Sequence, residues 1–156
     1  MPDAPLTCLD LWFRAGSFRE APGEEGLAHF LEHMVFKGSK NLLPGEFDQQ
    51  IEALGGSSNA ATGLDDVQFY VLVPPQKAET AIELLLNLVL TPTLLPNEFS
   101  TEREVVLEEI AQYRDQPDEQ VLQKFLELCW EGHPYGRSIL GLEETLKECT
   151  PEKMKK

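Results

Sequence analysis

Hydrophobic and polar residues follow two different periodicities along this chain, one typical of strands and one typical of helices. Residues 6–13 (LTCLDLWF) are apolar on both faces apart from Asp10, which predicts a buried strand. Residues 57–61 and 67–73 show the period of two that is typical of strands, and the turn-forming residues 62–66 between them predict a hairpin. The chain therefore contributes at least three strands to a sheet.

Helical spacing of apolar residues marks the other ordered segments. Proline and glycine bracket most of them, as they often bracket helices. Helices are expected at residues 25–36, 44–54, 78–90, 97–114 and 117–130, followed by a loop at 132–141. Strands and helices do not alternate as regular βαβ units, so the sequence predicts an α+β fold in which a mixed or antiparallel sheet packs against helices. A chain of 156 residues has the length of one domain.

The charge composition narrows the range of partners. Thirteen basic and 27 acidic residues give a formal net charge of -14. Nucleic-acid binding is disfavoured, because phosphate recognition requires a basic surface. We interpret the acidic residues as a solvated surface in preference to a docking site for cationic partners.

Neither a membrane nor an oxidising compartment is indicated. The longest apolar run, residues 81–90, is interrupted by polar residues and is too short to cross a bilayer, so no membrane association is expected. Cys8, Cys129 and Cys149 show no metal-binding or disulfide spacing, which favours a reducing compartment. No signal peptide is visible at the N-terminus, and a cytoplasmic protein is therefore expected.

The segment 26–36 (GLAHFLEHMVF) combines an apolar helix with three titratable groups. On a helix, His29, Glu32 and His33 fall within an arc of about 100°. The apolar residues of the segment occupy the opposite side. This helix therefore has one face suited to a core and one face suited to chemistry.

Two histidines one turn apart can bind the same metal ion, and zinc accepts imidazole ligands in a tetrahedral site. Glu32 lies on the same face and could act as general base toward a zinc-activated water molecule. The pattern H-x-x-E-H reverses the order of H-E-x-x-H. The alternative is that His29, Glu32 and His33 are surface residues of an ordinary amphipathic helix, and a third ligand would distinguish the two.

The helix at 97–114 offers candidates for that ligand. Glu102 and Glu109 fall on the same side as its apolar residues, whereas Glu104 and Glu108 fall on the opposite, solvent side. An unpaired carboxylate in a core costs several kcal/mol, roughly, so Glu102 and Glu109 each require a cation or strong donors. Zinc could be the partner of one carboxylate, and the second ring nitrogen of a histidine ligand could donate its N–H to the other carboxylate. The alternative is that both side chains extend into solvent at the edge of the apolar stripe.

These motifs resemble the inverted-zincin peptidases of the pitrilysin, insulinase and mitochondrial-processing-peptidase family. The similarity includes EGLAHFLEHMVFKGS, IEALGGSSNAATGLDDVQFYV, EREVVLEEI and HPYGRSILG. It implies that His29, His33 and Glu109 bind zinc and that Glu32 is the base.

The same resemblance assigns two further roles. It implies that Glu102 supports the metal ligands. Asn59 and Ala60 match the strand on which such enzymes hold a peptide by strand addition. For this pair, the alternative is an ordinary hairpin strand.

The resemblance also implies a second, similar α+β domain, which supplies an arginine and a tyrosine near the scissile carbonyl. We expect residues 1–156 to be a single N-terminal domain, incomplete at its C-terminal end, that needs a second homologous domain or subunit. The expected function is a zinc-dependent endopeptidase acting on extended peptides. A non-catalytic peptide-binding or assembly subunit is the first alternative. A structural zinc site is the second, although no cysteine near the motif offers a fourth ligand.

Three residues outside these motifs are expected to have structural roles. His133 lies in the HPYG segment with no second histidine nearby, and it is expected to be a turn residue. Trp12 and Trp130 are expected in the core.

Overall fold

The computed structural model describes residues 5–155 and shows an antiparallel sheet of three strands. Strand β3 (Val67–Val73) lies in the centre, between β1 (Thr7–Phe13) and β2 (Ser57–Thr62). The predicted hairpin is confirmed, since β2 pairs antiparallel with β3. The α+β class is also confirmed, because helices make up the rest of the ordered structure.

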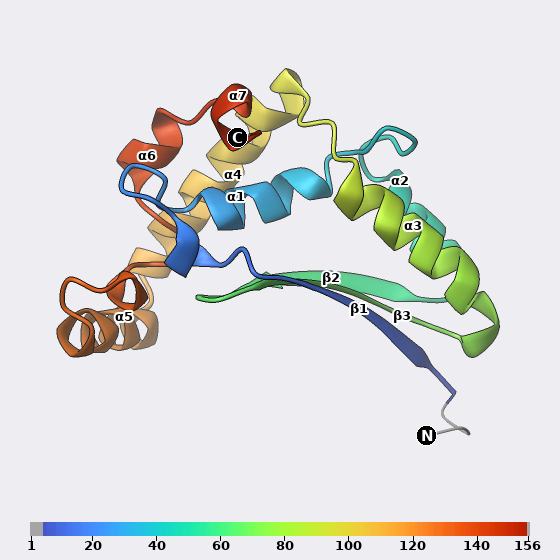
Figure 1. The fold of residues 1–156 in the computed structure, drawn as a ribbon, viewed down its shortest axis with the longest axis horizontal. Coiled ribbons are helices and arrows are strands. Elements are labelled where there is room, and N and C mark those ends of the chain that lie inside the picture. Colours follow the sequence, from blue (N-terminus) through green and yellow to red (C-terminus); the bar gives the residue numbers. More distant parts are fainter. Residues whose placement is uncertain (1–4, 156) are drawn as a thin grey trace.

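One face of the sheet carries the first hydrophobic core. The alternation along β3 buries Val67, Phe69, Val71 and Val73 on the same side. Helices α1 (Leu27–Val35), α2 (Glu46–Ala53) and α3 (Ala78–Leu90) lie on that side, while the opposite face carries no helix within residues 5–155 (Figure 1).

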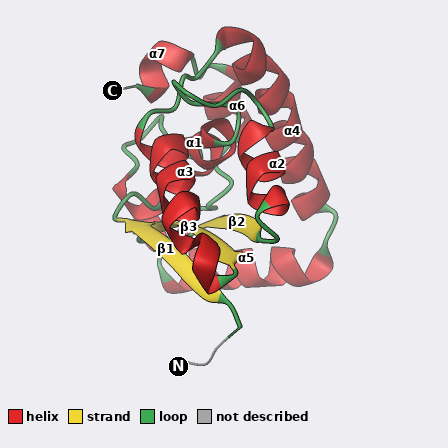
Figure 2. Ribbon diagram, turned by 90° about the vertical axis from the view of Figure 1, so that its right-hand side faces the viewer, coloured by secondary structure: helices red, strands yellow, loops and turns green. Residues whose placement is uncertain are grey.

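A second core joins α1 to the C-terminal helices α4 (Pro96–Arg114), α6 (Glu143–Lys147) and α7 (Pro151–Met154). Phe30 and Met34 of α1 pack here against Phe99, Val106 and Leu146. Because Val35 belongs to the first core, α1 connects the two. Figure 1 shows α1 above the sheet and next to α4, and in Figure 2 α4 lies to the right, with the sheet below α1.

The start of α1 is held by a nearby carboxylate and by close packing against a distant glycine. Gly26, the residue before the helix, has φ 91°, a left-handed conformation that favours glycine. The Glu20 carboxylate accepts hydrogen bonds from the N–H groups of Gly26 and Ala28, at 3.1 and 2.9 Å. A Cβ atom on Gly141 would lie 2.4 Å from the Gly26 nitrogen, so only glycine fits this approach.

The sheet differs from the sequence prediction at β1. This strand lies at the edge of the described sheet and has no buried residue, and among residues 5–155 no element covers its outer face. Trp12 points to that side and is 59% exposed. The predictions of a buried strand and of a core Trp12 were therefore wrong.

Helix α5 (Pro117–Cys129) lies at the surface. It begins at the predicted proline, but none of its residues is buried, and Val121, Phe125 and Leu128 are exposed. Trp130 follows the helix and packs on His133 and Tyr135 at the surface, so its predicted core position was wrong as well.

Among residues 5–155, no helix has the combination of length and apolar character that a bilayer span requires.

Candidate metal centre

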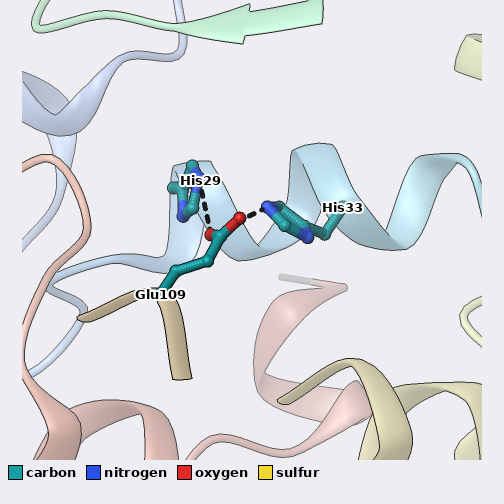
Figure 3. A group of neighbouring side chains, drawn as sticks. All are labelled: His29, His33 and Glu109. Carbon is teal, nitrogen blue, oxygen red and sulfur yellow. Dashed lines mark ion pairs between the residues drawn. The ribbon is translucent and has the colours of Figure 1, made fainter. Parts of the chain in front are cut away.

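Helices α1 and α4 bring together three of the side chains singled out from the sequence. His29 and His33 lie one turn apart on α1, and Glu109 reaches them from α4 (Figure 3). One ligand atom from each residue lies within 4.8 Å of the others. The chain thus folds two histidines and a carboxylate around one point.

The spacing of these atoms fits a zinc ion. Oε2 of Glu109 lies 3.7 Å from Nε2 of His29 and 3.4 Å from Nε2 of His33. In a tetrahedral site with bonds of about 2.0–2.1 Å, ligand atoms lie about 3.4 Å apart. Glu109 Oε2 is buried without a hydrogen bond, as is Nδ1 of His29. Buried polar atoms normally have a partner, and a cation between the rings would supply one for Glu109 Oε2.

His29 is held in its neutral form. Its side chain is 13% exposed, and the His33 ring centroid lies 4.6 Å from its own. Burial, and then the neighbouring His33, lower the pKa of His29 to about 4. Neutral imidazole is the form that binds metals.

His33 has a partner on its other ring nitrogen. Nδ1 lies 2.8 Å from Oε1 of Glu102, whose side chain is 8% exposed. The second oxygen of Glu102 lies 2.7 Å from the Lys37 ammonium. Sequence reasoning missed Lys37, although its position one turn after His33 placed it on the same face of the helix.

Glu32 occupies the side of α1 that faces the sheet. Burial raises the pKa of Glu32, a hydrogen bond from Thr62 and the charge of His33 lower it, and the charge of Glu109 raises it. The Thr62 hydroxyl of β2 donates to Oε2 of Glu32. Sequence reasoning did not identify Thr62, although strand alternation places it on the same face as Ala60.

A cavity of about 400 Å³ opens beside these groups. His29, Glu32, Ala60 and Thr62 line one side of it. Its other walls are mainly apolar and come from α4, α5 and the segment after them: Tyr113, Leu122, Leu126, Ile139 and Leu140. The candidate metal centre therefore adjoins a hollow with apolar walls.

The predicted peptide-binding pair lies on an edge strand. Strand β2 pairs only with β3 among the described strands, so its other side is free there. Ala60 lines the cavity, whereas Asn59 is not among the lining residues. The side-chain oxygen of Asn59 accepts a hydrogen bond from the Ala60 N–H, at 2.9 Å. The role of Asn59 and Ala60 in peptide binding stays a prediction.

The two α4 glutamates differ more than their common stripe suggested. Glu102 is buried, whereas the Glu109 side chain is 41% exposed with one oxygen buried against the histidines. On the same helix, the apolar side chain of Val105 is exposed. The buried face of α4 is therefore narrower than the predicted stripe, and it contains Phe99, Glu102, Val106 and Ile110.

His133 lies away from this centre, at the turn where it was expected. Its Nδ1 accepts a hydrogen bond from the Tyr135 N–H at 3.2 Å, before the short helix η3 (Pro134–Gly136).

Comparison with known proteins agrees with this geometry. Residues 2–143 match the family model described as Insulinase (Peptidase family M16). A protein of Rickettsia bellii named "Uncharacterized zinc protease" is 35% identical over 147 residues, which cover 94% of this chain and 36% of the relative. A probable mitochondrial-processing peptidase subunit beta of Arabidopsis thaliana is 32% identical over 96% of this chain and 28% of its own length.

A solved structure shares the arrangement of elements. The crystal structure of a protease from Helicobacter pylori matches with a TM-score of 0.92 and 31% identity, covering 97% of this chain and 37% of that chain. This chain spans about a third of the length of the relatives it matches.

Proposed function

Because this chain belongs to the insulinase family of peptidases, we propose that it carries the zinc site of a metalloendopeptidase that hydrolyses extended peptides. The observation that carries this proposal is the convergence of His29, His33 and Glu109, with Glu32 on the adjoining face of α1.

In this proposal the two imidazole Nε2 atoms and a Glu109 oxygen hold the ion. Their spacing and the unpartnered buried oxygen of Glu109 support that assignment. When bound, zinc supplies a Lewis acid that polarises the scissile carbonyl and acidifies a water molecule.

Glu32 is the proposed general base. Burial raises the pKa of Glu32 toward the neutral range, where a carboxylate accepts a proton more readily. The Thr62 hydroxyl holds one carboxylate oxygen and leaves the other to accept the proton from water. Glu32 then delivers that proton to the leaving amine.

The cavity and the free edge of β2 support a peptide as substrate. An extended peptide would pair with this edge at Asn59 and Ala60 through backbone hydrogen bonds, which require little side-chain specificity. The apolar walls beside Glu32, formed by residues such as Leu122 and Ile139, suit an apolar side chain next to the scissile bond.

Glu102 has a supporting role in this proposal. Its oxygen, 2.8 Å from Nδ1 of His33, accepts the N–H of that ring and directs the opposite nitrogen toward Glu109.

A second homologous domain or subunit is proposed as the partner. The relatives are about three times as long as the matched region, and one of them is named as a subunit. Residues 1–156 then act as an N-terminal domain whose full activity requires groups from that second part.

Zinc analysis tests this proposal most directly. The purified chain should bind about one zinc ion per molecule, and His29→Ala should lose it, whereas the control His133→Ala should retain it. A native chain that cannot take up zinc would refute the metal site.

A peptide-cleavage assay separates the peptidase from the non-catalytic alternative. Activity should appear when a candidate second domain is added and should fall by orders of magnitude with Glu32→Gln. A zinc-loaded assembly that binds peptides without cleaving them would instead support a binding or assembly subunit.

A further inference from the structure

We propose that Lys37 is a positioning residue of the metal centre, whose ammonium holds Glu102 in the orientation that fixes the ring of His33. This inference rests on the proposed zinc site. Neither the motif nor the comparison with relatives assigns a role to this lysine.

Glu102 uses its two oxygens for two different partners. Oε1 lies 2.8 Å from His33 Nδ1, and Oε2 lies 2.7 Å from Lys37 Nζ. Two contacts on opposite oxygens fix the plane of the carboxylate, whereas one contact would leave the terminal torsion free, since that torsion is broad. Glu102 is buried, so water does not readily replace a lost partner.

The backbone that carries Lys37 is itself anchored. The Lys37 N–H donates to the Met34 carbonyl at 3.1 Å, which ends α1 with a tight turn. The next carbonyl, that of Gly38, accepts from both the N–H and the hydroxyl of Thr93, each at 3.1 Å. The backbone that carries the Lys37 ammonium is therefore held in place, although the Lys37 side chain is 32% exposed.

Lys37 therefore affects the proposed metal ligand His33 indirectly, through Glu102. When the carboxylate accepts the Nδ1–H of His33, the lone pair is on Nε2, which faces Glu109. Loss of Lys37 frees one oxygen of Glu102, and the carboxylate can then rotate away from Nδ1. The His33 ring would lose its fixed tautomer and part of its fixed orientation.

Zinc affinity of three variants tests this role. Lys37→Met should weaken zinc binding about tenfold in a competition titration, which is the lower end of the effect of removing an outer partner of a ligand. Lys37→Arg should restore most of the affinity, because arginine keeps the donor and the charge. Lys40→Met is the matched control, since Lys40 is exposed on the same segment and should bind zinc like the native chain.

The tautomer of His33 gives a second readout in the metal-free protein. Nitrogen NMR shifts of the imidazole should show the Nδ1–H form in the native chain and in Lys40→Met. Lys37→Met should show a mixture with the Nε2–H form, which a purely structural role of the lysine would not produce. His33→Gln identifies the signals by their loss.

The two readouts separate this inference from the proposed function. Native zinc affinity together with a native His33 tautomer in Lys37→Met would overturn the role of Lys37 while leaving the zinc site intact. Failure of the native chain to bind zinc would overturn the proposed function, and the tautomer measurement would still decide whether Lys37 orients His33.

Discussion

The two sides of helix α1 hold their titratable groups in different ways. Toward α4, His33 contacts Glu102 and Glu109, and Lys37 contacts the second oxygen of Glu102. Toward β2, Glu32 has one hydrogen bond, from the neutral Thr62 hydroxyl, and faces an open cavity.

This difference suits two different roles, ion binding and proton transfer. Groups that hold an ion need fixed positions, and hydrogen-bonded partners such as Glu102 provide them. A base must accept a proton and release it, so a single neutral partner and access to substrate are more suitable. The α4 side is therefore suited to binding, and the β2 side to reaction.

Removing the ligand on the α4 side should have the largest effect. Glu109→Gln is expected to reduce zinc affinity by more than the roughly 10–100-fold that follows loss of an outer partner, because an ion ligand itself is lost. A competition titration measures this change in zinc affinity. Glu108→Gln, an exposed neighbour on the same helix, should leave affinity unchanged, and equal losses in both variants would contradict the assignment of Glu109.

Removing the base on the β2 side should separate reaction from binding. Glu32→Gln should keep zinc and lower kcat about 10²–10⁴-fold, the usual range for a general base. The measurement is peptide cleavage by the chain together with its proposed second domain, alongside zinc content. Loss of zinc in this variant would show that the two sides of α1 do not divide these roles.

The metal-free protein should lose stability as the pH falls. The pKa of His29 is about 4 in the folded chain and about 6.5 when unfolded. Between these values the unfolded chain binds more protons, so the free energy of unfolding decreases from pH 6.5 toward pH 4, by up to about 3 kcal/mol from this residue. Denaturant unfolding of the native chain and His29→Gln across this range isolates the contribution, and identical pH dependence would contradict it.

The smallest effect is expected at Thr62. Thr62→Val removes the hydroxyl whose hydrogen bond lowers the pKa of Glu32, so that pKa should rise further. The acidic limb of the activity profile should then move to higher pH by about one unit or less, since one hydrogen bond contributes about 1 kcal/mol. Thr62→Ser keeps the hydroxyl and should behave like the native chain; a shift shared by both variants would exclude the hydrogen bond as its cause.

The sequence predicted the elements that depend on local chemistry. Helix α3 and strand β3 have the predicted limits, because each has one clear periodicity between turn-forming residues. The meeting of α1 with α4 followed from carboxylates placed on an apolar stripe, a pattern that requires a cation or donor nearby.

What the sequence could not predict depends on which surfaces meet. An apolar stripe on α5 and a tryptophan on β1 have the composition of core elements, but composition does not say whether a covering layer is present. Lys37 and Thr62 acquire their roles only through contacts with Glu102 and Glu32, from segments distant in sequence. The short helices α6 and α7 lie after the last predicted element and gave too weak a pattern.

The close approach of Gly26 and Gly141 means that packing at the start of α1 is completed late relative to the helix itself. Domains form as the chain leaves the ribosome, N-terminal part first. Both histidines follow Gly26 within the same helix, whereas Gly141, which packs against the start of that helix, is synthesised only after α4 and α5. The start of the helix that carries both histidines therefore lacks this packing contact until Gly141 has been synthesised.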